Sequence, residues 1–489
     1  MWTPLLALAA PLVLYGLHRL VHLGLLTRVG PGDEPGDEPG DEAAPPASDD
    51  ASLPRLLVQL PVYRERTTVQ RLVRAAGALD WPADRLELQA LDDSDDETRA
   101  IVDAEVEALV ARGLDARVLR RDDRAGYKAG ALAAGLAVSE AELVLVLDAD
   151  FVPAPDLARR LVPRLDDPGV ALVQARWGHR NRDESLLTRA QATLLDGHFR
   201  IEHRVRAATG LFFNFNGTAG IWRRSAIDAA GGWDPATLTE DLDLSYRAQL
   251  GGARFAYAAD VEVPAELPGS LAAFRSQQAR WATGSCQVLR RLGGRIATAP
   301  VGAARRLEAL LHLTANVGYP LVLGLALLLP AALVLDLPLP RELVLALALG
   351  GTLPVLAFYA TAARLAGRGP VGALVDALLA MALGVGISAA QTRAVVRGLL
   401  PGRGVFVRTP KRGDGGRPYR AAAAAPWPEL ALAGWTAWGL VDAVLAGCWE
   451  ALPWQVLFLA GFLWVGLGGL VRRPAAGRAP ADLAVAPEA

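Results

Sequence analysis

Two aspartates separated by one residue, Asp148 and Asp150, have the type and spacing that most directly suggest chemistry in this chain. They follow five consecutive apolar residues at 143–147, a pattern typical of a strand buried on both faces of a parallel sheet. Ligands of open α/β sheets bind beyond the carboxyl ends of the strands. Two hard oxygen ligands there suit a divalent cation that carries a diphosphate. The alternative is a capped turn between strand and helix.

Lysine is almost absent, which makes the lysines that are present informative. Of 50 basic residues only Lys128 and Lys411 are lysine, and the other 48 are arginine. An ammonium is a compact point charge, whereas a guanidinium is a planar fork. We therefore expect both lysines at positions where arginine fails, with phosphate contact as the obvious role. A genome biased toward arginine codons would explain the composition without any function.

Alternating strands and helices must position these residues between Leu53 and about Tyr257. The predicted strands are 55–60, ended by Pro61, then 86–91, 116–119 and 143–147, and the predicted helices are 68–79, 98–112 and 127–139. This alternation predicts βαβ units around a parallel sheet. Three of the strands end in polar clusters, at 61–65, 92–93 and 148–150. A rim that gathers polar groups from several strand ends is a ligand site.

Two later clusters add amide, carboxylate and cationic groups. Residues 212–220 are aromatic, small and amide-rich, and Thr239-Glu-Asp241 lies at a predicted helix start, where Thr239 could cap the helix. A carboxylate in a first helical turn is commonplace without any catalytic role. A predicted helix at 271–292 carries Gln277-Gln-Ala-Arg-Trp281. A tryptophan beside an arginine at a membrane boundary is often only part of an aromatic belt.

Composition and hydropathy divide the chain into a soluble part and a membrane part. Its 489 residues are 52% hydrophobic, the formal net charge of −2 gives no sign of a nucleic-acid partner, and the two cysteines form no disulfide framework. The mean hydropathy is +0.24. Five stretches are predicted to span a membrane, namely 1–28, 307–335, 342–364, 428–449 and 451–471. The first is long and lacks a positive start, which favours an uncleaved anchor over a signal peptide.

The segment 370–397 is predicted to be an interfacial or re-entrant helix. It carries Asp376 and Gln391, and residues 364–420 around it hold ten Arg or Lys against two Asp. Both flanks are therefore basic and belong on the cytoplasmic side, which a crossing helix would not allow. With this segment uncrossed, the amino terminus lies outside and the α/β domain lies in the cytoplasm.

The remaining segments connect these units. Residues 29–52 include Pro-Gly-Asp-Glu three times, and 31–50 hold eight carboxylates and no base, as expected of a disordered linker. The α/β domain is expected at 53–265, interfacial helices at 266–306, a cytoplasmic loop at 398–420 and a disordered tail at 472–489. The loop holds Phe406 to Lys411 and could close over a ligand.

Taken in order, these motifs resemble the membrane-embedded, processive family 2 glycosyltransferases of the cellulose-synthase-like group, above all plant mannan and glucomannan synthases and their bacterial relatives. The resemblance rests on 92–93, 148–150, 215–217, 239–241, 277–281 and 406–411, and covers roughly 50–415. It implies a cytosolic GT-A domain, Rossmann-like with a mostly parallel sheet. This domain would lie between an N-terminal transmembrane helix and a C-terminal helical transmembrane region, in a bacterial inner membrane.

The resemblance also implies roles for individual residues. Nucleotide contacts would fall to Tyr63, Glu65, Asp92, Asp93, Lys128, Thr409 and Lys411. Asp148 and Asp150 would hold Mg²⁺ or Mn²⁺, and Asp241 would be the general base beside Glu240. The acceptor would contact Asn216, Gly217, Gln277, Arg280 and Trp281. Arg64 stands where the group commonly has asparagine.

The implied reaction is inverting transfer of a hexose from GDP-mannose or UDP-glucose to a growing β-1,4-linked polysaccharide that is extruded across the membrane. Two other functions stay open. One is single-sugar transfer to a lipid, ceramide or diacylglycerol, and the other is a non-catalytic scaffold or transporter. Membrane lipid is an expected partner in each case, and nothing in the sequence indicates an oligomeric state.

Overall fold

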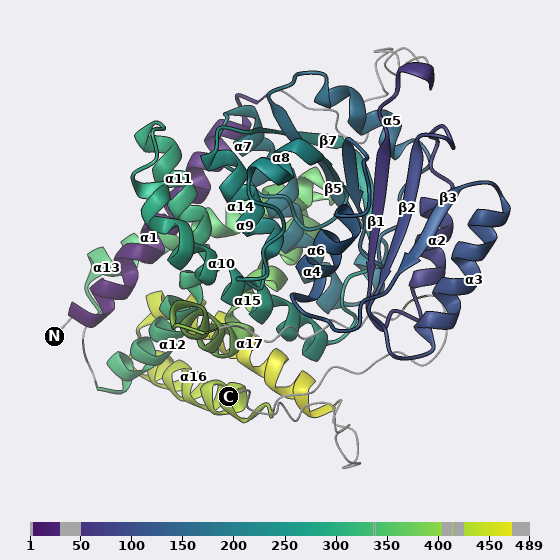
Figure 1. Cartoon of the computed structure of the whole chain (residues 1–489). Coiled ribbons are helices and arrows are strands. Elements are labelled where there is room, and N and C mark those ends of the chain that lie inside the picture. The colour runs from purple at the N-terminus through teal and green to yellow at the C-terminus, as the bar shows by residue number, and fades with distance from the viewer. Residues whose placement is uncertain are drawn as a thin grey trace.

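The computed structural model describes residues 3–29, 50–335, 337, 339–402, 413 and 425–471. One seven-stranded sheet, in the order β3-β2-β1-β4-β6-β5-β7, forms the centre of an α/β domain (Figure 1). The strands are β1 (Leu56–Val62), β2 (Leu86–Asp92), β3 (Asp115–Leu119), β4 (Leu143–Val146), β5 (Val170–His179), β6 (Gly220–Arg223) and β7 (Arg254–Ala265). Only β6 runs antiparallel to its neighbours. The predicted α/β class with a mostly parallel sheet is confirmed.

The predicted helices between the strands also form. They are α2 (Val69–Ala76), α3 (Thr98–Ala111) and α4 (Tyr127–Leu136). One boundary prediction is wrong, because Pro61 does not end the first strand, which continues to Val62 beside β2. On its other edge, β1 pairs with β4 only as far as Gln59. Proline has no N–H to donate, and at position 61 β4 no longer offers a partner that would need one, so Pro61 is tolerated within the strand.

Strand β4 is buried on both faces of the sheet. Leu143 and Leu145 pack into the core that includes β1, β2, α2 and α3. Val144 and Val146 point the other way, into a second core that includes α4 and β6. Alternate side chains of a strand point to opposite faces, so a continuous apolar run fills both cores. The chain is therefore held firmly on both sides where the polar segment 148–150 begins.

The other regular elements of the described chain are helices. Short helices α5 (Leu157–Leu161) and α8 (Arg224–Ala229) belong to the α/β domain, as do α6 (Leu186–Asp196), the π-helix η4 (Gly197–His203), α7 (Arg204–Ala208) and α9 (Glu240–Leu250). The others are α1 (Thr3–Leu26), α10 (Leu271–Ala297), α11 (Ala303–Thr314), α12 (Gly318–Val334), α13 (Arg341–Leu345), the π-helix η6 (Ala346–Thr352), α14 (Leu353–Leu365), α15 (Pro370–Leu399), α16 (Trp427–Leu445) and α17 (Leu452–Val471). Figure 1 shows α12, α16 and α17 side by side beneath the α/β domain.

Within the part of the chain that the structure describes, five helical stretches are long and apolar enough to cross a membrane, as expected of a multi-pass membrane protein. They are Pro4–Leu26, Ala303–Val334, Arg341–Leu365, Pro370–Leu399 and Trp449–Leu470. The helix predicted to be interfacial, α15, thus meets the criterion of length and hydropathy, whereas α16, predicted as a span, is not among the five. Of the five, α15 is also the most buried inside the protein: 56% of its apolar stretch is buried, against at most 44% in the other four.

Candidate active site

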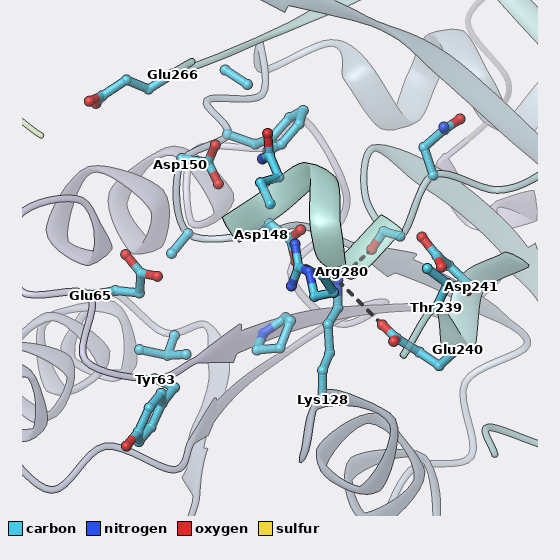
Figure 2. A pocket seen from close by; sticks show the side chains of 18 of the residues that line it. Tyr63, Glu65, Lys128, Asp148, Asp150, Thr239, Glu240, Asp241, Glu266 and Arg280 are labelled. Atoms are coloured by element: carbon cyan, nitrogen blue, oxygen red, sulfur yellow. Dashed lines mark hydrogen bonds and ion pairs between the residues drawn. The ribbon is translucent and has the colours of Figure 1, made fainter. Parts of the chain in front are cut away.

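A cavity at the carboxyl ends of the parallel strands gathers most of the predicted site residues (Figure 2). Its wall includes Tyr63, Glu65, Asp93, Lys128, Asp148, Asp150, Asn216, Gly217, Glu240, Asp241, Gln277, Arg280 and Trp281. In Figure 2, Tyr63 and Glu65 lie at one end, Glu240 and Asp241 lie at the other, and Lys128 lies between them. The strand ends, α9 and α10 therefore meet at one site, as the polar clusters predict.

Asp148 and Asp150 follow β4 directly into this cavity. The backbone N–H of Asp148 donates to the hydroxyl of Thr218 at 2.9 Å, which ties the turn to the segment before β6. The Asp148 side chain is 34% exposed within the cavity. Two carboxylates this close at a strand end offer the hard oxygen ligands that Mg²⁺ and Mn²⁺ prefer, so the residues fit the expected metal.

Lys128, at the start of α4, lies against the same carboxylate. Its ammonium donates to Asp148 Oδ1 at 2.6 Å and to the carbonyl of Gly217 at 2.9 Å, and it lies 4.0 Å from Glu240. Burial works to lower the pKa of Lys128, but the carboxylates of Asp148 and Glu240 outweigh it and raise that pKa. Lys128 therefore stays charged among the acids, at a place where it can meet a diphosphate.

Asp241 lies in the first turn of α9, deep in the cavity. The N–H of Leu242 donates to its Oδ1 at 2.8 Å. Burial, and then the charge of Glu240, raise the pKa of Asp241 to about 7, against the opposing charge of Lys128. A carboxylate with a pKa near the working pH suits a general base. Thr239 precedes the helix but its hydroxyl does not cap it, contrary to the sequence prediction, because its side chain packs against α10 at Gly284.

Gly217 passes so close to Asp241 that a side chain has no room. Its φ is +82°, and a Cβ there would lie 2.8 Å from Asp241 Oδ2 and 3.3 Å from Lys128 Nζ. Contact shorter than 3.0 Å forces an atom to move. Glycine at this position therefore lets the loop before β6 approach Asp241 and Lys128 without displacing either side chain.

Helix α10 supplies the remaining wall. Ser270 caps its first turn, because the Ser270 Oγ accepts the N–H of Ala273 at 3.3 Å. Gln277, Arg280 and Trp281 follow at helical spacing, so they share one face, and all three line the cavity. The charge of Arg280 lowers the pKa of Asp241, although burial outweighs it.

A second, larger cavity adjoins the first. Its volume is about 510 Å³ against about 170 Å³. The two share Trp177, Leu195, Asn216, Thr239, Asp241, Gln277 and Trp281. Beyond this shared wall the larger cavity is lined by α1, α12, α14, α15 and α17, through residues that include Tyr15, Val322, Phe358, Met381 and Phe458. Asp241 thus faces both the carboxylate-lined site and a space among the apolar helices.

Asp92 is the predicted nucleotide ligand that the structure places away from the cavity. It is 1% exposed, and its carboxylate accepts from Arg120 at 2.9 and 3.1 Å and from the N–H of Ser94 at 3.0 Å. Neighbouring residues at a strand end point to opposite sides, so only Asp93 reaches the cavity, where Arg121 holds it. In this structure the Asp92 carboxylate therefore supports the fold through Arg120 and Ser94.

Two predicted residues, Thr409 and Lys411, lie outside the described part of the chain, so their role stays a prediction. The same holds for Phe406, most of the acidic linker and the tail. From the loop at 398–420, Gly413 is described, and its N–H donates to the Glu266 carboxylate at 3.0 and 3.2 Å. Glu266 is itself a residue of the cavity wall.

Several residues of the cavity wall were not predicted from the sequence. The guanidinium of Arg124 lies 3.2 Å from the centre of the Tyr63 ring, and Trp177, His179 and Glu266 close the wall from β5 and β7. The apolar run at 170–173 was the available signal for β5, whose end presents Trp177 and His179 on one face. No feature of the sequence distinguishes Arg124 from the many other arginines of this chain.

A mostly parallel sheet with one antiparallel strand, and carboxylates at the ends of its central strands, is the arrangement of a GT-A domain. Comparison with known proteins locates the resemblance. Residues 54–284 match the model described as glycosyltransferase like family 2. The predicted resemblance to this family is confirmed over that segment.

Curated relatives are plant enzymes. The chain is 47% identical over 247 residues to glucomannan 4-beta-mannosyltransferase 2 of Arabidopsis thaliana, covering 50% of this chain and 46% of the relative. It is 45% identical over 247 residues to glucomannan 4-beta-mannosyltransferase 1 of Oryza sativa subsp. japonica, covering 50% and 47%. The match therefore spans about half the length of each relative.

A solved structure shares the fold over a longer stretch. It is a mannosyltransferase from Pyrobaculum calidifontis in complex with GDP-Man and Mn²⁺, which aligns with a TM-score of 0.50 at 23% identity. The alignment covers 80% of this chain and 98% of that one. At this identity the likeness concerns the fold.

Proposed function

We propose that this protein is an inverting hexosyltransferase that moves mannosyl units from a nucleotide-diphosphate sugar to a growing β-glycan and passes the product through the membrane. The observation that carries the proposal is the position of Asp241, in a wall shared by the carboxylate-lined cavity and the larger cavity among the apolar helices. Mannose is favoured over glucose because the relatives at 47% and 45% identity are glucomannan mannosyltransferases. GDP-mannose is accordingly the first donor to test, and UDP-glucose the second.

In the proposed reaction each residue of the site has a separate role. Asp241 takes the proton of the acceptor hydroxyl, opposite the leaving diphosphate, as single-displacement inversion requires. A divalent cation held by Asp148 and Asp150 would supply positive charge to the diphosphate. Lys128, 2.6 Å from Asp148, adds charge at the same place. Trp281 offers an apolar face for an acceptor sugar at the entrance to the larger cavity.

We also propose that α15 runs along the membrane boundary rather than across it. Asp376, which is fully buried near one end, pairs with Arg189 of α6 and accepts from Arg368 at 2.9 Å. Near the other end, the Thr283 hydroxyl of α10 donates to the carbonyl of Ala394 at 3.0 Å. Two ends that both contact the α/β domain and its adjoining helix α10 support an interfacial position. The basic flanks favour the cytoplasm for that side. The plant relatives lend no support to a bacterial inner membrane.

The test is a donor screen with the full chain reconstituted in lipid vesicles. Each nucleotide sugar is supplied with Mg²⁺ or Mn²⁺, and both released nucleotide and labelled product are measured. The expected product is a polymer, with GDP-mannose preferred, that linkage analysis shows to be β-1,4-linked. Asp241→Asn, of nearly equal size, serves as the inactive control.

The alternatives give different products in the same vesicles. A labelled glycolipid in place of a polymer would contradict the polymer synthase and support transfer to ceramide or diacylglycerol. An Asp241→Asn variant with the wild-type rate would contradict any role for this site in catalysis.

A further inference from the structure

A line of polar contacts runs from the acceptor end of the site to the N-terminal helix. The Nε2 atom of His198 lies 2.9 Å from Asn216 Nδ2, and its Nδ1 atom lies 3.2 Å from Glu202 Oε2. Glu202 also accepts from Arg206 at 3.2 Å and forms an ion pair with Arg19 of α1. Asn216 is part of the wall that the two cavities share. The mechanism proposed above uses none of the residues behind it.

The carboxylate at one end of this line decides the hydrogen-bond roles along it. An ionised Glu202 can only accept, so Nδ1 of His198 carries the proton. In a neutral imidazole, Nε2 is then the acceptor, and it requires an N–H from Asn216. The amide of Asn216 is therefore held with Nδ2 toward His198 and its oxygen turned the other way, an orientation that the side chain alone would leave open.

The surroundings keep His198 in this neutral form. Burial, followed by the nearby His203 and His312 rings and the charges of Arg206 and Arg19, holds the pKa of His198 well below its usual range. Its side chain is still 23% exposed, within the larger cavity that it lines. The ring therefore stays an acceptor toward Asn216 at physiological pH while it borders the space for the acceptor.

The backbone that carries these groups is unusual. His198 and Glu202 lie in η4, a π-helix of seven residues between α6 and α7, with the two side chains four residues apart. Single π-helical turns within α-helices occur frequently at functional sites. Their placement here turns both side chains toward Asn216 and α1.

The line ends in a balanced set of buried charges. Arg206 donates to Glu308 of α11 at 3.0 Å as well as to Glu202, and Glu308 also contacts His18 of α1 at 2.5 Å. Two arginines, Arg19 and Arg206, thus face two glutamates. Paired buried charges hold their partners in place, and removing one partner leaves the other uncompensated. The far end of the line is therefore rigid, although it lies among the apolar helices.

We propose that His198 and Glu202 are positioning residues that, anchored by Arg19 of α1, fix the amide of Asn216 at the acceptor end of the active site. The inference rests on the proposed glycosyl transfer. It makes α1 a supporting part of the acceptor site as well as a membrane anchor. Loss of this support should impair transfer to the acceptor and leave donor binding unchanged.

The test compares three variants in the full chain in vesicles. His198→Leu removes both hydrogen bonds, and we expect a fall in kcat of about 10- to 100-fold, as for small misplacements of reacting groups. The KM for the donor and the Kd for the nucleoside diphosphate should stay within twofold of wild type. His198→Gln should restore most of the rate, because an amide offers an acceptor and an N–H at nearly the spacing of the ring nitrogens.

The control is His22→Leu, which removes another buried histidine of the same region that contacts Glu308 but is not bonded to Asn216, His198 or Glu202. An unchanged kcat in His198→Leu would overturn the inference, as would equal losses in His198→Leu and His22→Leu, or a glutamine variant no better than the leucine variant. A wild-type protein that makes no product from any donor overturns both proposals, whereas an active wild type with any of these variant results overturns this one alone.

Discussion

Gly217→Ala tests how closely the loop before β6 must approach the base. The new Cβ would lie 2.8 Å from Asp241 Oδ2, whereas ordinary contact starts at 3.4 Å, so about 0.6 Å of movement is needed. The same Cβ would lie 3.3 Å from Lys128 Nζ, which limits how far the loop can shift to avoid Asp241. Since a misplacement of about 1 Å can cost about 100-fold in rate, we expect kcat to fall about 10- to 100-fold. The left-handed φ adds a loss of about 1 kcal/mol in stability.

The matched control is Gly113→Ala. Gly113 has a φ of +88°, close to the +82° of Gly217, but a Cβ there meets nothing within 4 Å. Both variants should lose similar stability in thermal unfolding, and only Gly217→Ala should lose transfer activity at saturating donor. Equal kcat values for Gly217→Ala and wild type would refute the argument that this glycine sets the position of Asp241.

Four further predictions follow from the site and its supports. Asp148→Asn should lower kcat by about 10²-fold or more and raise the Mn²⁺ concentration for half-maximal rate, because it removes a charged ligand. Lys128→Met should cost about 10²-fold in kcat, and Lys128→Arg should not restore it, because a planar fork does not replace a point charge. Burial raises the pKa of Asp241 from 3.8 to about 7, so the rate should fall below about pH 7 as the base is protonated. Because the folded state then holds this proton more tightly than the unfolded chain does, ionisation of Asp241 should destabilise the metal-free fold increasingly from about pH 4 to 7. Asp241→Asn should then be inactive yet more stable at pH 8, by roughly 1 kcal/mol per unit of pKa shift, and equal thermal stability at pH 8 would contradict this. Arg275→Met should destabilise the protein by about 3–5 kcal/mol in detergent, because Glu429, fully buried and 2.8 Å from Arg275, loses its partner, and Arg275→Met with Glu429→Leu should recover most of the loss.

The strongest parts of the sequence prediction concern residues whose surroundings leave a periodic pattern. The run at 143–147 is typical of a short strand buried on both faces, and β4 is such a strand. The helix predicted at 271–292 forms as part of α10, and Gln277, Arg280 and Trp281 lie on one face of it. Lys128 stood out because lysine is rare in this chain, and its ammonium does lie beside Asp148.

Other features depend on contacts that no local pattern encodes. Asp92 and Asp93 are identical neighbours, and only the end of β2 decides which one enters the cavity. Strand β6 enters the sheet between β4 and β5 in the opposite direction, an order set by packing between distant segments. His198 carries no motif of its own, and its contacts come from three separate parts of the chain.

Arg64 stands at an unusual backbone position. Its φ is +54°, a conformation that asparagine adopts more readily than most residues, and its guanidinium pairs with Asp95 at 2.6 Å. The backbone here therefore suits the asparagine that the resemblance leads one to expect at this position.

The larger cavity joins the two ends of the described fold. Leu12 and Tyr15 from α1 face the same space as Trp454 and Phe458 from α17. Because α1 is synthesised long before α17, the wall of this cavity stays incomplete until α17 has packed against the other helices. The sheet and the carboxylate-lined cavity at its strand ends can fold before that point, whereas the larger cavity is enclosed only once α17 is in place.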